Sequence, residues 1–305
     1  MQNQLDDTSK REWDLAILTG LTLLALATRS YGIAEWDLVQ DEVFTVTRAA
    51  ERYTSLRNPA YYVLVMGSFK LFGVSEWAAR LPAMLLGILS VPVFYVTCRS
   101  VLGRNVALIG ALLIIFSSWH LWYSQFSRFY AGVFLFGLLS YFLYYKAIRL
   151  GNPGYLAWAM LANVLGILFH ATSVMVPASC ATFSAFVLLS KQAAGSDYSR
   201  RIATIHLAFC AVGGLIAVFL FWHIVELWYA AKQSWGYGPA GLVLQIAKKV
   251  QIPIVLSAIF GMIFLLQRDV LRGIFFAAGI GIPVVALLVG SVVIPPTRPI
   301  YMFYA

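Results

Sequence analysis

Two adjacent acidic residues, Asp41 and Glu42, follow the first membrane-length apolar stretch of the chain, residues 15–33. A charge at the centre of a bilayer costs roughly 2.5–3.5 kcal/mol even on the mildest insertion scale. We therefore expect the pair at the edge of the membrane, where a carboxylate meets both water and lipid headgroups. One interpretation is a solvated loop of a membrane protein. The other is a reactive site, and it depends on the segments that follow.

The composition is that of an integral membrane protein with several spans. Of the 305 residues, 61% are hydrophobic and 11% are charged, and the mean hydropathy is +0.79. Globular domains carry about 25% charged residues, so a soluble core does not account for these values. The net charge is +9, but the basic residues form short clusters between apolar runs. This pattern excludes a nucleic-acid partner and favours topology signals and contacts with anionic membrane lipids.

The cysteines and the N-terminus carry less information. Cys98, Cys180 and Cys210 all lie within apolar runs, without a metal-ligand spacing, which is typical of small buried hydrophobic residues. Lys10 and Arg11 precede the first apolar run as in a signal peptide. Acidic residues are also present before that run, so we expect an uncleaved membrane anchor.

The apolar runs predict an all-α, polytopic helical bundle that forms one transmembrane module over residues 1–305. The membrane helices are expected at about 15–33, 80–98, 105–121, 129–148, 154–170, 171–190, 201–224, 250–267 and 273–293.

Basic clusters near helix ends mark the cytoplasmic side of a membrane protein. The candidate clusters are Lys10/Arg11, Arg99/Arg104, Lys146/Arg149, Lys191/Arg200/Arg201 and Arg268/Arg272. The chain must cross the membrane an even number of times between two such clusters. The apolar run 154–190 is therefore expected to form two helices with a turn near His170. For the same reason, 41–53 and 59–74 are interpreted as helices in the outer interface.

The same count places four segments on the outer face: the Asp41–Glu42 pair, the stretch from Trp119 to Arg128, the turn at His170 and a loop over residues 225–249. We therefore expect Asp41, Arg128 and His170 to converge on one surface.

Taken in order, several short segments resemble one family of membrane enzymes. They are Arg29 with Gln40–Glu42, Arg57–Tyr62, Leu71–Gly73 with Glu76 and Arg80–Pro82, Tyr123–Gln125 with Arg128 and Tyr130, Gly166 with His170, and Arg298 with Tyr301. The set is similar to polyprenyl-phosphate-sugar-dependent glycosyltransferases of the GT-C superfamily. Its greatest similarity is to the dolichyl-phosphate-mannose protein mannosyltransferase-like family, which includes the aminoarabinose transferase of lipid A. Asn58-Pro59 replaces the usual double proline of that family.

The resemblance implies transfer of a sugar from a polyprenyl-phosphate donor to a hydroxyl of a lipid, glycan or protein acceptor, with inversion. An alcohol needs a base to remove its proton as the new bond forms. Asp41 is the expected general base, and Glu42 is either a catalytic partner that orients Asp41 or the acceptor, or a solvated side chain. No cofactor and no obligatory metal are expected, although a divalent metal remains possible.

The leaving polyprenyl phosphate needs positive charge, and the planar guanidinium of arginine binds phosphate through two donors. Arg57 and Arg128 are the first candidates for this role, with Arg29 and Arg298 as the second. His170 is a candidate for the phosphate or the acceptor. Tyr61, Tyr62 and Tyr130 are candidates for stacking on the sugar, or are ordinary residues of the aromatic belt.

Two other classes of protein stay open. A transporter or flippase of a lipid-linked precursor would also bind a polyprenyl phosphate, and a membrane scaffold would bind without catalysis. The family usually continues beyond this length, so the C-terminal part of the family is expected to be missing here. The expected location is a prokaryotic inner membrane, with the site on the non-cytosolic side.

Overall fold

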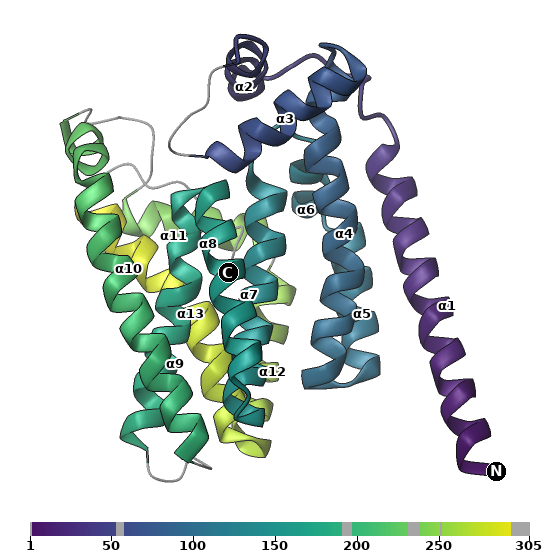
Figure 1. Ribbon diagram of the computed structural model, residues 1–305, viewed down its shortest axis with the longest axis vertical. Helices are drawn as coiled ribbons and strands as arrows, with labels where there is room; N and C mark the ends of the chain where they lie inside the picture. Colours follow the sequence, from purple (N-terminus) through teal and green to yellow (C-terminus); the bar gives the residue numbers. More distant parts are fainter. Residues whose placement is uncertain (1, 53–57, 191–196, 231–237, 251, 294–305) are drawn as a thin grey trace. The chain divides into compact units, whose positions relative to one another are not determined.

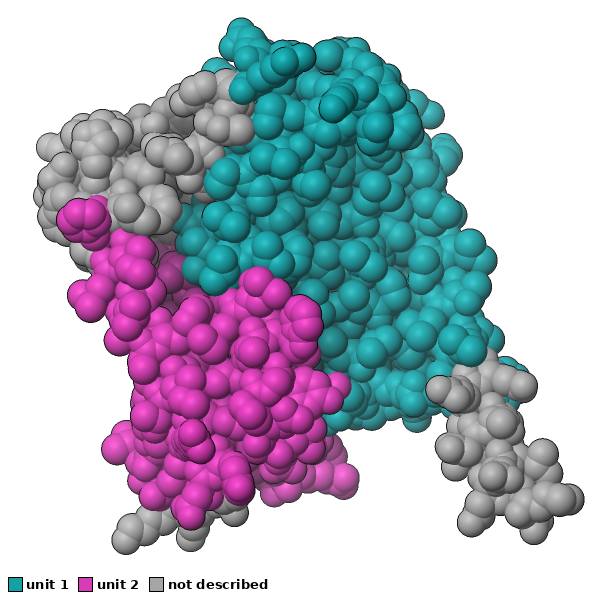
Figure 2. All heavy atoms as spheres, in the orientation of Figure 1, with its two compact units in different colours: residues 1–142, 164–171 teal, residues 143–163, 172–305 magenta. Residues whose placement is uncertain are grey.

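The computed structural model describes residues 2–52, 58–190, 197–230, 238–250 and 252–293, and all regular structure in these ranges is helical (Figure 1). The chain divides into two compact units, Met1–Phe142 with Val164–Ala171, and Leu143–Asn163 with Thr172–Ala305 (Figure 2). The all-helical membrane class expected from the sequence is confirmed.

Unit 1 contains six complete helices among the described residues and the first part of a seventh. They are α1 (Gln2–Ser30), α2 (Gln40–Ala50), α3 (Pro59–Phe72), α4 (Glu76–Leu102), α5 (Arg104–Phe116), α6 (Ser118–Ser124) and the start of α7 (Tyr130–Leu150). Helix α4 is central in this unit, because α1, α3, α5 and α6 all contact it. Ser75 caps the N-terminus of α4, where its side chain accepts a hydrogen bond from the Ala78 N–H at 3.2 Å.

Unit 2 holds the rest of α7, most of α8 (Pro153–Phe169) and the C-terminal helices. The latter are α9 (Met175–Leu189), α10 (Asp197–Ala230), α11 (Pro239–Val250), α12 (Ile252–Arg268) and α13 (Val270–Val293). Helix α9 contacts both α10 and α13, and α13 also contacts α11 and α12.

Within the described residues, four helical segments are long and apolar enough to cross a membrane: Glu76–Leu102, Tyr130–Leu150, Ala171–Leu189 and Val270–Val289. A fifth candidate is the pair α5 and α6, whose axes are bent by 61°. The expected span 105–121 is therefore not one straight helix. The expected total of about nine spans stays a prediction.

The predicted division of residues 154–190 into two helices is confirmed. Helix α8 ends at Phe169, a short 3-10 helix covers Ala171–Val174, and α9 begins at Met175. Unit 1 includes the end of α8, where Phe169 fills the space beside Gly132 of α7. A side chain at position 132 would collide with the Phe169 ring, so the glycine permits this contact.

The predicted helices at 41–53 and 59–74 are present as α2 and α3, and their place at the membrane interface stays a prediction. The segment 225–249 is not an open loop throughout, because α10 continues to Ala230 and α11 begins at Pro239. Residues 231–237 lie outside the described residues.

Candidate active site

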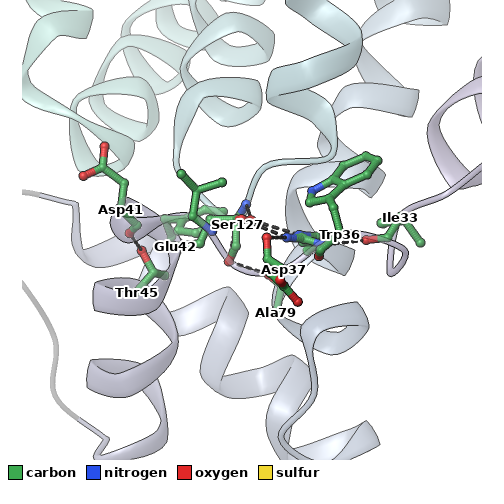
Figure 3. Close-up of polar contacts among 11 residues, drawn as sticks. Ile33, Trp36, Asp37, Asp41, Glu42, Thr45, Ala79 and Ser127 are labelled. Atoms are coloured by element: carbon green, nitrogen blue, oxygen red, sulfur yellow. Dashed lines mark hydrogen bonds and ion pairs between the residues drawn. The ribbon is translucent and has the colours of Figure 1, made fainter.

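Asp41 lies in the first turn of α2, and its side chain is exposed to solvent. The N-terminus of a helix carries a partial positive charge, which stabilises a carboxylate at this position. In the described part of the chain, the Asp41 carboxylate has neither a hydrogen bond nor an ion pair. It points away from Glu42 and Ser127 in Figure 3. Asp41 is therefore an ionisable group that is held by its backbone and open to a ligand.

The neighbouring Glu42 is in the opposite situation, because its side chain is fully buried. Arg80 donates from Nε to Oε1 and from Nη2 to Oε2, both at 2.9 Å. The backbone N–H of Ser127 donates to Oε1 at 2.7 Å, and that of Val39 donates to Oε2 at 3.2 Å. Four donors thus surround one carboxylate, and the alternative of a solvated Glu42 is wrong.

Arg80 of α4 binds more than this carboxylate. Its Nη1 donates to the carbonyl oxygens of Ile33 and Trp36, each at 2.9 Å, and Nη2 donates to that of Asp37 at 3.2 Å. One buried guanidinium therefore binds the α1–α2 loop and the first turn of α2 together (Figure 3). The sequence analysis included Arg80 only as part of a motif and did not propose a role for it. Its position before Pro82 within an apolar run was the available signal.

Ser127 connects the same cluster to α3 and α4. Its Oγ donates to the Ala79 carbonyl oxygen at 2.8 Å and accepts a hydrogen bond from the Tyr61 hydroxyl at 3.3 Å. Burial raises the pKa of Tyr61, so its phenol stays protonated and serves as the donor. Because Glu42 also holds the Ser127 N–H, the backbone is fixed immediately before Arg128.

Arg128 lies at the first turn of α2, next to Asp41. Its Nη1 is 3.4 Å from the Asp41 carbonyl oxygen and 3.3 Å from Thr45 Oγ1. Its Nε is buried and has no hydrogen-bond partner among the residues that the structure describes. A helix N-terminus disfavours a cation, so an anion bound here would be stabilised both by the guanidinium and by the helix dipole.

His170 lies close to the same segment through a ring contact. Its imidazole stacks on Phe129 with ring centroids 3.9 Å apart and an interplanar angle of 9°. The Arg128 guanidinium carbon is 5.2 Å from the centroid of the same Phe129 ring. The structure thus brings Arg128 to Asp41 and brings His170 to the residue that follows Arg128. The membrane side of this group stays a prediction.

Arg29, a second candidate for phosphate binding, is a structural residue in this fold. Its side chain is fully buried, and its guanidinium donates to the carbonyl oxygens of Ile114 at 3.1 Å and Ile115 at 3.3 Å. These carbonyls lie at the end of α5, where the last carbonyl groups of a helix have few partners of their own; the backbone N–H of Ser117 also donates to the Ile114 carbonyl oxygen, at 3.4 Å. Arg29 Nη2 is also 2.9 Å from His120 Nδ1. The expectation of a phosphate-binding Arg29 does not fit these contacts.

The three tyrosine candidates are also core residues in this structure. Tyr61, Tyr62 and Tyr130 have exposed fractions of 0%, 1% and 5%. Tyr130 packs against the Tyr123, Phe126 and Phe129 rings. None of the three presents an open ring face, so the expectation of direct stacking on a sugar does not fit their burial.

The other two arginine candidates, Arg57 and Arg298, lie outside the described residues, and their roles stay predictions. Across the described ranges, no group of three or more histidine, cysteine or acidic side chains is placed to hold a metal ion.

Comparisons with known proteins agree with this architecture. The family model for dolichyl-phosphate-mannose-protein mannosyltransferase matches residues 57–222. The protein YkcB of Bacillus subtilis (strain 168), which is named as a mannosyltransferase, is 27% identical over 202 residues, covering 65% of this chain and 27% of YkcB.

The fold is also similar to that of a solved membrane protein. The crystal structure of ArnT from Cupriavidus metallidurans bound to undecaprenyl phosphate matches with a TM-score of 0.60 and 15% identity, over 97% of this chain and 58% of ArnT. The apo structure of the same protein gives a TM-score of 0.62 and 14% identity, over 97% of this chain and 57% of ArnT.

The chain is therefore a helical membrane protein whose fold is similar to that of ArnT. The chain belongs to the dolichyl-phosphate-mannose-protein mannosyltransferase family, because the family model covers more than half of its 305 residues. It spans 27% of the length of YkcB and 58% of that of ArnT.

Proposed function

We propose that this protein is a membrane glycosyltransferase that moves a sugar from a polyprenyl-phosphate donor to an acceptor hydroxyl, with Asp41 as the general base. The observation that carries the proposal is the pairing of two groups at the first turn of α2. One is an exposed carboxylate without a partner among the described residues, and the other is the Arg128 guanidinium, 3.4 Å from the Asp41 carbonyl oxygen. Membership of the family supports the reaction class.

In the proposed step, the acceptor oxygen attacks the anomeric carbon and the bond from that carbon to the phosphate oxygen breaks. Asp41 takes the acceptor proton as the new bond forms, which makes the oxygen a competent nucleophile. The configuration at the anomeric carbon inverts, because the acceptor attacks directly from the opposite face.

The leaving polyprenyl phosphate keeps the bonding electrons and gains negative charge. Arg128 stabilises that charge, because the buried Nε of its guanidinium has no partner in the described structure. Charge-assisted hydrogen bonds of this kind are about twice as strong as neutral ones. Undecaprenyl phosphate bound to ArnT is consistent with a donor of this class. Arg57 remains a first candidate and Arg298 a second candidate from the sequence. We propose His170, which stacks on Phe129 beside Arg128, as a contact for the phosphate or the acceptor.

Glu42 and Arg80 act as positioning residues in this proposal. Glu42 is enclosed by four donors and cannot take a proton from an acceptor without losing its ion pair with Arg80. Its role is to hold α2 and the segment before Arg128 in one arrangement.

The test is a transfer assay with Asp41→Asn in the full protein, reconstituted in lipid with a panel of undecaprenyl-phosphate sugars. Asparagine keeps the shape of the side chain but does not accept a proton. We expect wild-type affinity for undecaprenyl phosphate and a loss of transfer of about 100-fold or more. Asp37→Asn, in the neighbouring loop, is the matched control, because only the backbone of Asp37 contacts Arg80 in the described structure.

Two outcomes would overturn the proposal. Wild-type transfer by the Asp41→Asn protein would exclude Asp41 as the base. Movement of the labelled lipid across vesicles by the wild-type protein, without any transfer, would identify the flippase alternative instead.

A further inference from the structure

Several helix ends of unit 2 meet at the lower end of the helices in Figure 1. The N-terminus of α10 contacts the C-terminus of α7, where Ser199 Oγ donates to the Ile148 carbonyl oxygen at 2.8 Å. The turn between α12 and α13 contacts the same end of α7, because Arg149 Nη2 lies 3.7 Å from Asp269 Oδ2.

This end of unit 2 has an excess of positive charge. Its described charged side chains are Lys146, Arg149, Arg200, Arg201, Arg268 and Arg272, opposed by Asp197 and Asp269. The sequence predicts that all three basic clusters involved here face the cytosol.

Asp269 lies between two of these arginines but does not satisfy them. Its Oδ1 accepts a hydrogen bond from the backbone N–H of Arg272 at 3.0 Å and so caps the N-terminus of α13. Its Oδ2 faces both guanidinium groups, 3.7 Å from Arg149 and 3.3 Å from Arg272. Arg272 Nε is buried without a hydrogen-bond partner in the described part of the chain. Two guanidinium groups therefore share one oxygen that is only loosely coordinated.

Exposed apolar side chains flank this arginine pair. Leu150 is 65% exposed, Val270 is 58% exposed and Tyr198 is 67% exposed. A free anion would bind the arginines but would leave these apolar side chains exposed. A phospholipid can cover them with its acyl chains while its phosphate binds the arginines.

We propose that Arg149 and Arg272 bind the headgroup phosphate of an anionic phospholipid in the leaflet at this end of unit 2. The phosphate oxygens bind the two guanidinium groups beside Asp269, and the acyl chains lie over Leu150 and Val270. This inference is independent of the proposed transfer reaction, and it assigns the site to a structural membrane lipid instead of the sugar donor.

The test is a titration of the detergent-solubilised full protein with dioctanoyl-phosphatidylglycerol, followed by thermophoresis. Dioctanoyl-phosphatidylcholine and inorganic phosphate are titrated separately. We expect saturable binding of phosphatidylglycerol that weakens about fivefold for each arginine removed, and therefore about 25-fold in Arg149→Gln/Arg272→Gln. The charge-matched control Arg48→Gln/Lys70→Gln in unit 1 should keep wild-type affinity.

A second variant keeps the test decisive if the double variant does not fold. Asp269→Asn preserves the cap of α13, because asparagine is a good N-cap residue, but removes the competing charge. We expect tighter phosphatidylglycerol binding in this protein, and unchanged or weaker binding contradicts the proposal. Equal affinity for phosphatidylcholine, or equal binding by inorganic phosphate, also overturns the assignment to an anionic lipid.

Discussion

Arg80 and Glu42 form a fully buried ion pair, in which both guanidinium-to-carboxylate hydrogen bonds are 2.9 Å long. The pair joins α4 to the first turn of α2, where Asp41 lies next in sequence. Breaking one partner of a buried pair costs about 3–5 kcal/mol, because the other charge is left without compensation. The geometry around Asp41 therefore depends on residues that do not take part in the proposed transfer.

Replacing both members of the pair provides a sharp test of this role. Isolated buried ion pairs are often replaced by apolar residues with little loss of stability. Here Arg80→Met/Glu42→Met also removes the donors for three loop carbonyl oxygens, those of Ile33, Trp36 and Asp37. Each buried unpaired group costs about 1–3 kcal/mol, so we expect the double variant to melt well below the wild type in detergent. A wild-type melting temperature would contradict this structural role.

Arg128→Gln tests the proposed phosphate contact. A hydrogen bond to a charged group contributes about 1.5–3 kcal/mol, so the dissociation constant for undecaprenyl phosphate should rise by about 10- to 150-fold. Arg48→Gln, on the same helix as Asp41, removes the same charge and should have a much smaller effect. Binding is measured by titration with the lipid in detergent. Equal affinity in the wild type and in Arg128→Gln would remove Arg128 from the donor site.

Arg29→Met distinguishes between two possible roles of Arg29, stabilising the fold and binding the phosphate of the lipid. The carbonyl oxygen of Ile115 loses its side-chain donor and that of Ile114 keeps only the Ser117 N–H, so the protein should be destabilised by about 1–3 kcal/mol. Because the side chain is fully buried, we expect no change in affinity for undecaprenyl phosphate at a temperature where the variant is folded. A loss of lipid affinity with an unchanged melting temperature would restore the phosphate-binding interpretation of Arg29.

Gly87→Ala tests the close approach of α6 to α4. A Cβ at this position collides with the side chain of Ser124, and overpacking of this kind costs about 1–3 kcal/mol. Gly67→Ala in α3 is the matched control, because a Cβ there meets nothing within 4 Å and alanine favours the helix. The melting temperature should fall in the first variant and stay level or rise in the second.

Phe129→Leu tests the ring shared by Arg128 and His170. Leucine keeps an apolar side chain but removes both the stacking on His170 and the cation–π contact, each worth about 0.5–1.5 kcal/mol. We expect transfer to fall by about tenfold while Phe129→Tyr remains near the wild type. A transfer rate in Phe129→Leu equal to that of the wild type would show that the ring does not position either neighbour.

The helices of this fold follow from the apolar periodicity and from the parity of the basic clusters. These two signals located α2, α3 and the turn at His170, because burial and topology leave few alternatives for runs of such length. They did not reveal the bend at Ser117, although Ser117 and Ser118 interrupt the apolar run there and Ser117 caps the N-terminus of α6. At that bend, Arg29 from a distant part of the chain donates to the carbonyl oxygens of Ile114 and Ile115 at the end of α5.

The candidate active site was also predictable only in part, because some of its residues are identified by tertiary contacts alone. Asp41 and Arg128 stand out because a charged side chain close to a membrane-length apolar run is energetically unfavourable. Such residues are therefore candidates for a functional site. Glu42 and Asp41 are neighbours of the same chemical type, and only tertiary contacts distinguish them. The four donors around Glu42 come from α4, the loop before α2 and the segment before α7, so no local pattern identifies it as buried. The tyrosines were misjudged because a sequence does not reveal which ring faces are covered.

The Arg80 guanidinium of α4 makes five hydrogen bonds: three to the loop before α2, at Ile33, Trp36 and Asp37, and two to Glu42 in the first turn of α2. A swing of α2 away from α4 would have to break the two buried bonds to Glu42. The backbone of Asp41, the proposed base, is thus held in place by its neighbour Glu42. In the proposed reaction, the acceptor would therefore have to approach a carboxylate whose backbone stays in one position.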